Sequence, residues 1–413
     1  MFQVVLGGAS ALFAHHVFFI HGEWHLSVHH IVLAHVFVAL YLFYFSNQNH
    51  DTLGRAISCA CLAIIGYLGT LLGSMSIYRL FFHKVSHFPG PRLASITKFW
   101  HIYQIRDSKN YLFQRRLHEN SAIFTRDEFE HKERRKVWTQ SLSTKAMDSL
   151  RPRIAQQAES PYRCIKGYGD QPVDVDEVMS WFSFDAMGEV VFGEDFNLMD
   201  SRTMHPAILH RDRALAVLGP ISDAIWIARL AFSFIPFYGR VKDWFRMVAF
   251  CDERMRARME VGIVLHRGPK EGKPDMASWF IEEHQRLASS MNSRARSLLL
   301  SGTATSAVVA GSDTTRASLI ATWWYLSKYP EHADRVYMEI RDVNIRDANI
   351  LATLPHLNGV INEVLRLVPP AMTGGGRITG PDGLLIDNTL IPPFTKVTAP
   401  KYVIMRSTKL RIH

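Results

Sequence analysis

Cysteine is scarce in this chain, and the positions of the few that occur exclude several kinds of site. The 413 residues contain four cysteines, Cys59, Cys61, Cys164 and Cys251, and none follows the last of these. Their spacing matches neither a zinc site nor the disulfide framework of a small secreted domain. The first two stand within an apolar run, where cysteine behaves as a small hydrophobic residue. This pattern is compatible with a reducing compartment for the main part of the chain.

Repeats, low-complexity segments and large blocks of one charge are also absent. The net charge of +9 is divided among short clusters, such as residues 132–136 and 254–258. Because no nucleic-acid-binding motif accompanies them, we predict no nucleic-acid partner. The cluster at 132–136 fits a docking face for an acidic protein or an anionic membrane surface. For the cluster at 254–258, an ordinary solvated helix face is the better interpretation.

Charged residues are missing from three long stretches at the start of the chain. Residues 1–20, 26–45 and 56–78 contain no Lys, Arg, Asp or Glu, and each approaches or exceeds the ~20 residues that a helix needs to cross a bilayer. Basic residues follow the third stretch at once, so the positive-inside rule places the main part of the chain in the cytosol. We predict a membrane anchor of up to three helices over residues 1–82. In the alternative arrangement only residues 56–78 span the bilayer.

Histidines are concentrated in this amino-terminal region, where residues 25–30 read His-Leu-Ser-Val-His-His. This run resembles a histidine box of the membrane di-iron desaturases and hydroxylases. Two iron atoms need several such boxes from separate membrane hairpins, and no second or third box follows. Histidines at the membrane interface are therefore the favoured interpretation.

A mainly α body is predicted after a proline-rich hinge. Pro89 and Pro91 fix the backbone and remove hydrogen-bond donors, so residues 83–99 form the hinge. From Trp100 the apolar periodicity is helical, with a small β element near the end. Helices are expected at 100–118, 154–164, 175–192, 208–230, 241–259, 276–287, 295–329, 330–343 and 357–367. Strands are expected at 384–391 and 396–404, joined through Pro392 and Pro393.

Two motifs late in the chain indicate chemistry. In the first, Gly311 loosens a helical turn beside Asp313 and Thr314, an acid and an alcohol that can relay protons. In the second, Glu363 and Arg366 stand three residues apart on one helix face, where they can form an ion pair. Taken alone, the first motif also fits a polar patch whose Thr side chain bonds to the preceding helical turn.

Together with four other segments, these motifs resemble the cytochrome P450 family, in particular its membrane-anchored fungal members. Residues 88–94 resemble the family's proline hinge, residues 131–143 its haem-propionate helix, and residues 184–193 a core helix of fungal members. Residues 310–315 resemble the oxygen-activation motif and residues 363–366 the paired-helix motif, while residues 384–402 resemble the short sheet that follows. The resemblance covers most of the chain and implies a helical cytochrome P450-like fold.

The resemblance implies a role for each residue of the two motifs. Gly311 would open the helix so that dioxygen fits beside the haem iron. Asp313 and Thr314 would deliver protons to the bound oxygen. Glu363 and Arg366 would form a structural pair that holds the haem-side loop.

The resemblance also implies a haem cofactor, whose carboxylates would be bound by three cationic side chains. His131 and Arg135 lie one helical turn apart and could reach the haem together. Arg377, just before the small sheet, matches another propionate-binding position. Ordinary surface solvation is the alternative interpretation of all three residues.

Two parts of the family pattern are missing. Only residues 119–130 connect the helix at 100–118 with the helix at His131, where the family has a strand pair and another helix. The family's axial cysteine has no counterpart, because none of the four cysteines has a suitable context, and we assign no metal ligand. We therefore expect residues 100–413 to be an incomplete haem-thiolate domain and the chain to be truncated and inactive.

The function implied by the resemblance is that of a monooxygenase that oxidises a hydrophobic small molecule in fungal secondary metabolism. It would reside in the endoplasmic reticulum membrane and receive electrons from an NADPH-dependent reductase docked near Lys132 and Lys136. A non-catalytic membrane-anchored remnant is the second hypothesis. A membrane di-iron oxidase that uses the amino-terminal histidines is the third.

Overall fold

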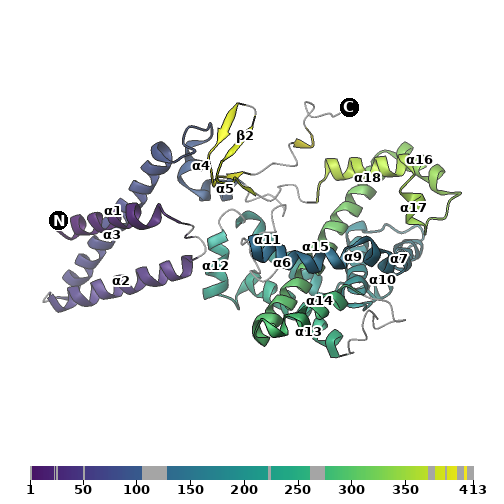
Figure 1. The fold of residues 1–413 in the computed structure, drawn as a ribbon, viewed down its shortest axis with the longest axis horizontal. Helices are drawn as coiled ribbons and strands as arrows, with labels where there is room; N and C mark the ends of the chain where they lie inside the picture. The colour runs from purple at the N-terminus through teal and green to yellow at the C-terminus, as the bar shows by residue number, and fades with distance from the viewer. Residues whose placement is uncertain are drawn as a thin grey trace. The chain divides into compact units, whose positions relative to one another are not determined.

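The computed structural model describes residues 2–22, 24, 27–49, 52–104, 128–221, 225–260, 275–370, 377–386, 388–397 and 404–406. The chain divides into two compact units (Figure 1). The first unit comprises residues 1–109, 218–241 and 377–397, and the second comprises residues 110–217, 242–376 and 398–413. Helices dominate both units, and the described strands form two small antiparallel sheets. The predicted fold class, mainly α with a small β element, is confirmed.

The first unit contains the apolar amino-terminal helices and both sheets. Its helices are α1 (Phe2–Phe13), the π-helix η1 (Ala14–Phe19), α2 (Val28–Asn49), α3 (Leu53–Ile77), the π-helix η3 (Tyr78–Phe82), α4 (Arg92–Ile96), α5 (Lys98–Gln104) and α12 (Ile225–Phe234). Its strands are β1 (Arg377–Ile378), β2 (Leu384–Ile386), β3 (Thr389–Ile391) and β4 (Lys396–Val397).

The second unit contains the remaining helices. They are α6 (Glu128–Ser141), α7 (Thr144–Gln157), α8 (Glu159–Lys166), α9 (Val175–Phe192), α10 (Leu198–Ser201), most of α11 (Pro206–Ile221), most of α13 (Gly239–Glu260), α14 (Met276–Arg286), the 3₁₀-helix η5 (Leu287–Ser289), α15 (Ser293–Lys328), α16 (Pro330–Ile340), α17 (Ala348–Leu351) and α18 (Pro355–Leu367).

Two of the three predicted membrane helices are long and apolar enough to cross a bilayer. They are Val28–Asn49 and Leu53–Phe82, whereas the first apolar helix, Gln3–Phe19, is shorter. This shorter helix packs closely along α3 through small residues. A Cβ on Gly7 would lie 2.4 Å from the carbonyl oxygen of Ala63, and one on Gly66 would lie 2.9 Å from that of Val4. Glycine therefore permits an approach of the two backbones that larger residues would prevent.

Histidines of this region join the apolar helices. His15 is buried in η1, and its Nδ1 lies 2.6 Å from Ser74 Oγ of α3. His35 Nε2 of α2 lies 3.1 Å from the Tyr67 hydroxyl of α3. Among the described residues, no three metal-ligating side chains converge. His25, the first residue of the resembling box, lies outside the described part.

The predicted hinge contains a turn that is fixed to the short sheets of the same unit. The Lys84 ammonium group donates hydrogen bonds to the carbonyl oxygens of Pro393 and Phe394, at 2.5 and 3.1 Å. Arg79 Nη1 donates to the Ile96 carbonyl oxygen at 2.6 Å, which closes the segment from η3 to α4. These contacts give the hinge a defined shape within the first unit.

The prediction of two long strands was wrong in detail. Residues 384–391 form a hairpin of two strands, β2 and β3, with Leu385 opposite Leu390. Gly383 precedes the hairpin with a φ of 77°, in the left-handed region that favours glycine. Of the second predicted strand only Lys396–Val397 is extended, and it pairs with Arg377–Ile378. Residues 398–403 lie outside the described part.

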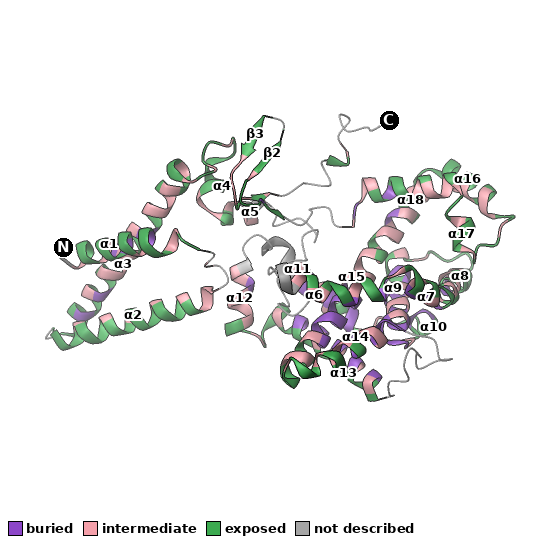
Figure 2. Cartoon of the chain, viewed as in Figure 1, coloured by how far each residue is buried: buried purple, intermediate pink, exposed green. Residues whose placement is uncertain are grey.

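The core of the second unit is built around α9 and the first half of α15, where Figure 2 shows most of the buried residues. α9 begins after Asp174, whose carboxylate accepts hydrogen bonds from the backbone N–H groups of Asp176 and Glu177. It ends at Gly193, which has a φ of 67°. A buried ion pair at 2.7 Å between Arg153 Nη1 and Glu189 Oε1 joins α7 to α9.

Candidate functional site

The predicted acid–alcohol turn lies near the middle of α15, a helix of 36 residues. Asn292 starts the helix, because its side-chain oxygen accepts a hydrogen bond from the Ala295 N–H at 2.9 Å. After two partly exposed turns, the segment from Leu300 to Val309 is buried against the core. From Gly311 onward the helix becomes partly exposed, so the turn stands where α15 leaves the core.

Gly311 packs directly against Met187 of α9. A Cβ at this position would lie 2.4 Å from Met187 Cε and 2.5 Å from Met187 Sδ. α15 is a continuous α-helix through this turn, and the opening expected at Gly311 is not seen. The absence of a side chain here gives room to Met187. The admission of dioxygen stays a prediction.

Thr314 bonds to its own helix. Its hydroxyl donates a hydrogen bond to the Ala310 carbonyl oxygen at 2.6 Å, and the Ser312 hydroxyl donates to the Val308 carbonyl oxygen, also at 2.6 Å. Serine and threonine side chains commonly bond to the preceding turn of a helix. The hydroxyl is therefore adjacent to the Ala310 carbonyl, and its role in proton delivery stays a prediction.

Asp313 has an environment that disfavours its ionised form. Burial raises the pKa of its carboxyl group above the usual value, the cationic Arg211 opposes this shift, and the neighbouring Asp212 adds to it. Within the described part of the chain, no hydrogen bond to this carboxyl group is seen. A raised pKa makes an acid a better proton holder than an ordinary surface carboxylate.

Arg211 of α11 brings a cation into the interior beside this turn. Its side chain is fully shielded from water. Its Nη1 donates to Ser312 Oγ at 2.7 Å, and its Nε donates to Asp212 Oδ1 at 2.9 Å. The Ser312 hydroxyl thus accepts from Arg211 while it donates to the helix backbone. α11 and α15 are joined at the residue next to Asp313.

Arg316 extends the charged network toward the surface. Its Nη1 donates to Asp212 Oδ2 at 3.0 Å, and its Nη2 lies 2.7 Å from Asp176 Oδ1 at the start of α9. Asp212 is therefore shared by Arg211 and Arg316. The network joins α9, α11 and α15 around Asp313, and its alternating charges reduce the cost of desolvation.

Sequence reasoning missed these network residues. Arg316 could have been found from the sequence, because it stands three residues after Asp313, and side chains with this spacing are neighbours on a helix. Arg211 carries no such signal, since 101 positions separate it from Ser312. Only the packing of α11 against α15 identifies it.

The two cations predicted to bind haem carboxylates in the second unit lie on α6. His131 is half-buried and Arg135 is exposed, one helical turn apart. Within the described residues, neither side chain makes a hydrogen bond or an ion pair. They are therefore available to an anionic ligand. Arg377 lies in β1 of the first unit, and its convergence with these two residues stays a prediction.

Glu363 and Arg366 of α18 form the predicted ion pair. Arg366 Nε lies 2.7 Å from Glu363 Oε2 and Nη2 lies 2.6 Å from Oε1, so the contact is bidentate. The third nitrogen, Nη1, donates to the Met405 carbonyl oxygen. The pair is exposed, with 54% of the Glu363 and 42% of the Arg366 side chain accessible. It holds the segment at Met405 through a backbone contact, as a structural pair would.

The cysteines of the chain do not provide a thiolate for haem iron. Cys251 is fully buried in α13, and burial raises the pKa of its thiol to about 12. Cys164 is buried in α8, and Cys59 and Cys61 lie in the apolar helix α3. An iron ligand must be ionised and must face a cavity. None of these four cysteines therefore fits the axial position of a haem, and haem binding by the other predicted residues stays a prediction.

Comparison with known proteins identifies a family. The family model described as cytochrome P450 matches residues 96–410. The cytochrome P450 monooxygenase nodW of Hypoxylon pulicicidum is 26% identical over 458 aligned residues, which cover 97% of this chain and 79% of the relative. The cytochrome P450 monooxygenase sthD of Phaeosphaeria nodorum is 27% identical over 389 residues, with 83% and 79% covered. Tryprostatin B 6-hydroxylase of Neosartorya fischeri is 24% identical over 465 residues, with 97% and 80% covered.

The match to the family model extends over more than half of the chain and includes α6, the acid–alcohol turn of α15 and the Glu363–Arg366 pair. The helical architecture with small sheets agrees with it. The apolar helices α2 and α3 accompany this domain on its amino-terminal side. The chain belongs to the cytochrome P450 family and is similar to its fungal monooxygenases.

Proposed function

We propose that this chain descends from a membrane-anchored haem-thiolate monooxygenase of fungal secondary metabolism, and that its 413 residues do not carry out the catalysis themselves. The names of the fungal relatives support the ancestral activity, since they are monooxygenases and a tryprostatin hydroxylase. The substrate class is a hydrophobic small molecule. The observation that carries the second half of the proposal is that no cysteine fits the axial position.

In the ancestral enzyme, the residues of this site would surround a haem, which would supply the oxygen activation. His131 and Arg135 would bind its carboxylates, with Arg377 as a third cation. Asp313 would hold a proton, because burial raises its pKa. Thr314 would pass this proton onward when its hydroxyl leaves the Ala310 carbonyl. The proposal gives these 413 residues no catalytic step, because none of their four cysteines fits the axial position.

An internal gap in the catalytic domain is part of the proposal. The alignment with nodW has 458 positions, whereas 97% of this chain is about 400 residues, so more than 50 aligned positions have no residue here. This length difference agrees with missing residues, and the proposal places them between α5 and α6, where the sequence is too short for the family pattern. The boundaries proposed are an anchor over 1–82, a hinge over 83–99 and the incomplete domain over 100–413.

The proposed location is the endoplasmic reticulum membrane, with the second unit in the cytosol. α2, and the helix that α3 and η3 form together over Leu53–Phe82, are each long and apolar enough to span this membrane. An NADPH-dependent reductase is the proposed partner, docked on the basic face of α6 near Lys132 and Lys136. Lys136 is exposed, although it also pairs with Glu133. The proposal thus combines the monooxygenase ancestry with the second hypothesis drawn from the sequence, a non-catalytic membrane-anchored remnant.

The test is spectroscopic. The full chain would be produced with added haem, reduced and exposed to carbon monoxide. We expect no Soret band of the thiolate type. A stoichiometric thiolate-type band would contradict the proposed inactivity. Sequencing of the transcript across the codons for residues 104–128 then shows whether the messenger RNA encodes the short connection between α5 and α6 or a longer segment. Iron analysis of the same preparation tests the di-iron hypothesis, for which bound non-haem iron in a stoichiometric amount is the required result.

A further inference from the structure

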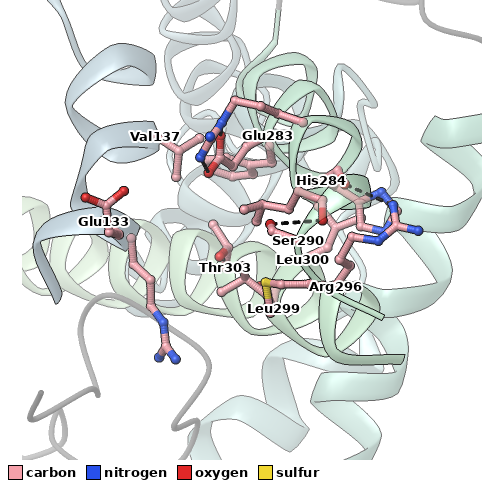
Figure 3. A pocket seen from close by; sticks show the side chains of 14 residues that line it. Glu133, Val137, Glu283, His284, Ser290, Arg296, Leu299, Leu300 and Thr303 are labelled. Carbon is pink, nitrogen blue, oxygen red and sulfur yellow. Dashed lines mark hydrogen bonds and ion pairs between the residues drawn. The ribbon is translucent and has the colours of Figure 1, made fainter. Parts of the chain in front are cut away.

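A cavity of about 350 Å³ lies in the second unit between α6, α14, η5 and the first turns of α15 (Figure 3). Its volume is at the lower end of the range for small-molecule sites, about 300 to 1,000 Å³. Apolar side chains form much of its wall, among them Val137, Phe280, Leu287 and Leu300. The cavity thus has the composition of a ligand pocket.

The cavity also contains a cation without an anionic partner. Arg296 of α15 uses its Nη1 to donate to the His284 carbonyl oxygen at 3.0 Å. Its Nε is buried and has no hydrogen-bond partner, and the same holds for His284 Nδ1. No carboxylate pairs with Arg296 within the described part of the chain. A buried donor left without a partner is costly, so a ligand that accepts from both groups would be stabilised.

The acids of the cavity are already paired. Glu283 accepts two hydrogen bonds from Arg286, both at 2.6 Å, and Glu133 pairs with Lys136 at 2.5 Å. Burial and the nearby Arg296 lower the pKa of His284, so its ring is neutral and can donate from one nitrogen. The positive charge of Arg296 therefore dominates one end of the cavity.

None of the residues that the family assigns to haem lines this cavity. On α6, Glu133 and Val137 lie two residues after His131 and Arg135, respectively, a rotation of about 200° around the helix axis. Arg134, which also lines the cavity, stands between these two faces of the helix. On α15, Thr303 stands seven residues before Ala310, about 10 Å along the axis. The side chains of Ala304, Ala307 and Val308 between them are packed in the core.

We propose that the cavity binds a small amphipathic monoanion, in which a carboxylate bonds to Arg296 and His284 and an apolar body packs against Val137, Phe280 and Leu300. The unpaired cation selects the charge of the ligand. The apolar wall selects its body. The site is independent of haem and of the proposed catalytic role.

Binding of 4-phenylbutyrate and of its neutral analogue 4-phenylbutyramide to the full chain in lipid nanodiscs tests the proposal by calorimetry. We expect the acid to bind about 10- to 100-fold more tightly than the amide, the effect of one charge-assisted hydrogen-bonded pair. Arg296→Gln should weaken binding of the acid to the level of the amide. Arg294→Gln removes an exposed charge from the same helical turn and should leave binding unchanged.

A second variant keeps the proposal testable if Arg296→Gln does not fold. Ser290 is exposed at the cavity, so Ser290→Trp should fold and should block binding of both compounds. Equal affinity for acid and amide would overturn the proposal. So would the absence of measurable binding to the unmodified chain, or an Arg296→Gln variant that binds the acid as the unmodified chain does.

Discussion

Arg211 is the side chain through which α11 is fixed to the acid–alcohol turn, and it has no contact with water. Arg211→Met would keep the length of the side chain but remove its hydrogen bonds to Asp212 and Ser312. We expect the free energy of unfolding to fall by about 2 kcal/mol, less than the 3–5 kcal/mol typical of a broken buried pair. The loss is smaller because Asp212 keeps Arg316 and is partly exposed.

Urea unfolding followed by tryptophan fluorescence measures this change. Arg213→Met is the matched control, since Arg213 is the exposed neighbour of Arg211, and it should alter the unfolding free energy by less than about 0.5 kcal/mol. Equal effects of the two substitutions would show that the contact with Ser312 contributes nothing to stability.

Asp313 should make the stability of the second unit depend on pH. Its folded pKa is raised, so its contribution to stability is complete below the unfolded pKa, about 4, and is lost as pH rises through the folded pKa. Asp313→Asn cannot ionise. We therefore expect the melting temperature of this variant to improve relative to the unmodified chain between pH 4 and pH 8.

The comparison needs an acid that is far from the site. Asp170→Asn removes an exposed carboxyl group from the loop after α8 and should not reproduce the trend. A relative melting temperature of Asp313→Asn that falls with rising pH would mean that Arg211 outweighs burial. The sign of the trend is thus the informative quantity.

Residues close in sequence could be predicted as a group, and their distant partners could not. Glu363 and Arg366 are one helical turn apart, so the sequence predicted their contact, and the structure shows it as bidentate. Asp313 and Thr314 were recognised by type and order. Arg211, which bonds to the adjacent Ser312, comes from another helix, and no local pattern encodes such a contact.

Among the elements, most regular helices were predicted well because apolar periodicity and capping residues act within a few positions. The helix predicted at 154–164 was wrong, since these residues fall across the end of α7 and most of α8. α9 runs over Val175–Phe192 as predicted, with Asp174 and Gly193 as its caps. The predicted helix at 208–230 is instead α11 and α12, with residues 222–224 outside the described part. The hairpin of β2 and β3 was read as one strand, because alternation alone does not reveal a turn between two short strands.

The contact between α1 and α3 provides a test at the level of the element. A Cβ on Gly66 would meet the backbone of Val4, with 2.9 Å to its carbonyl oxygen and 3.0 Å to its Cα. Backbone atoms cannot move aside without displacing the helix. We expect Gly66→Val to separate α1 from α3 in lipid nanodiscs, with faster hydrogen exchange over residues 2–13.

Gly69 supplies the control on the same helix, because a Cβ there meets nothing within 4 Å. Gly69→Val should leave exchange over residues 2–13 unchanged, while both substitutions alter the propensity of α3 equally. If the two variants exchange alike, the close approach through Gly7 and Gly66 does not hold α1 in place.

At the scale of the whole molecule, the second unit has a well-packed half and an open half. The segment Leu300–Val309 of α15 is buried, whereas 43% of Trp323 and 54% of Trp324 are exposed near the end of this helix. α18 shows the same openness, with Ile361 41% and Leu365 36% exposed and Val364 as its one buried residue. Large apolar side chains gathered on a surface usually mark an interface or a tendency to aggregate.

We expect this open half to cause self-association of the chain. In nanodiscs loaded with one chain each, sedimentation velocity should show association that increases with concentration, and Trp324→Lys combined with Leu365→Lys should reduce it. The physical reason is that a charge on the patch must be desolvated on contact, which costs more than the apolar burial returns. Tyr162→Lys, at an exposed aromatic residue of α8, is the control and should not reduce it. If the control reduces association as strongly as the double variant, the open half is not the cause of self-association. If the unmodified chain remains monomeric at all concentrations, the fold tolerates the exposure of Trp323, Trp324, Ile361 and Leu365 to water.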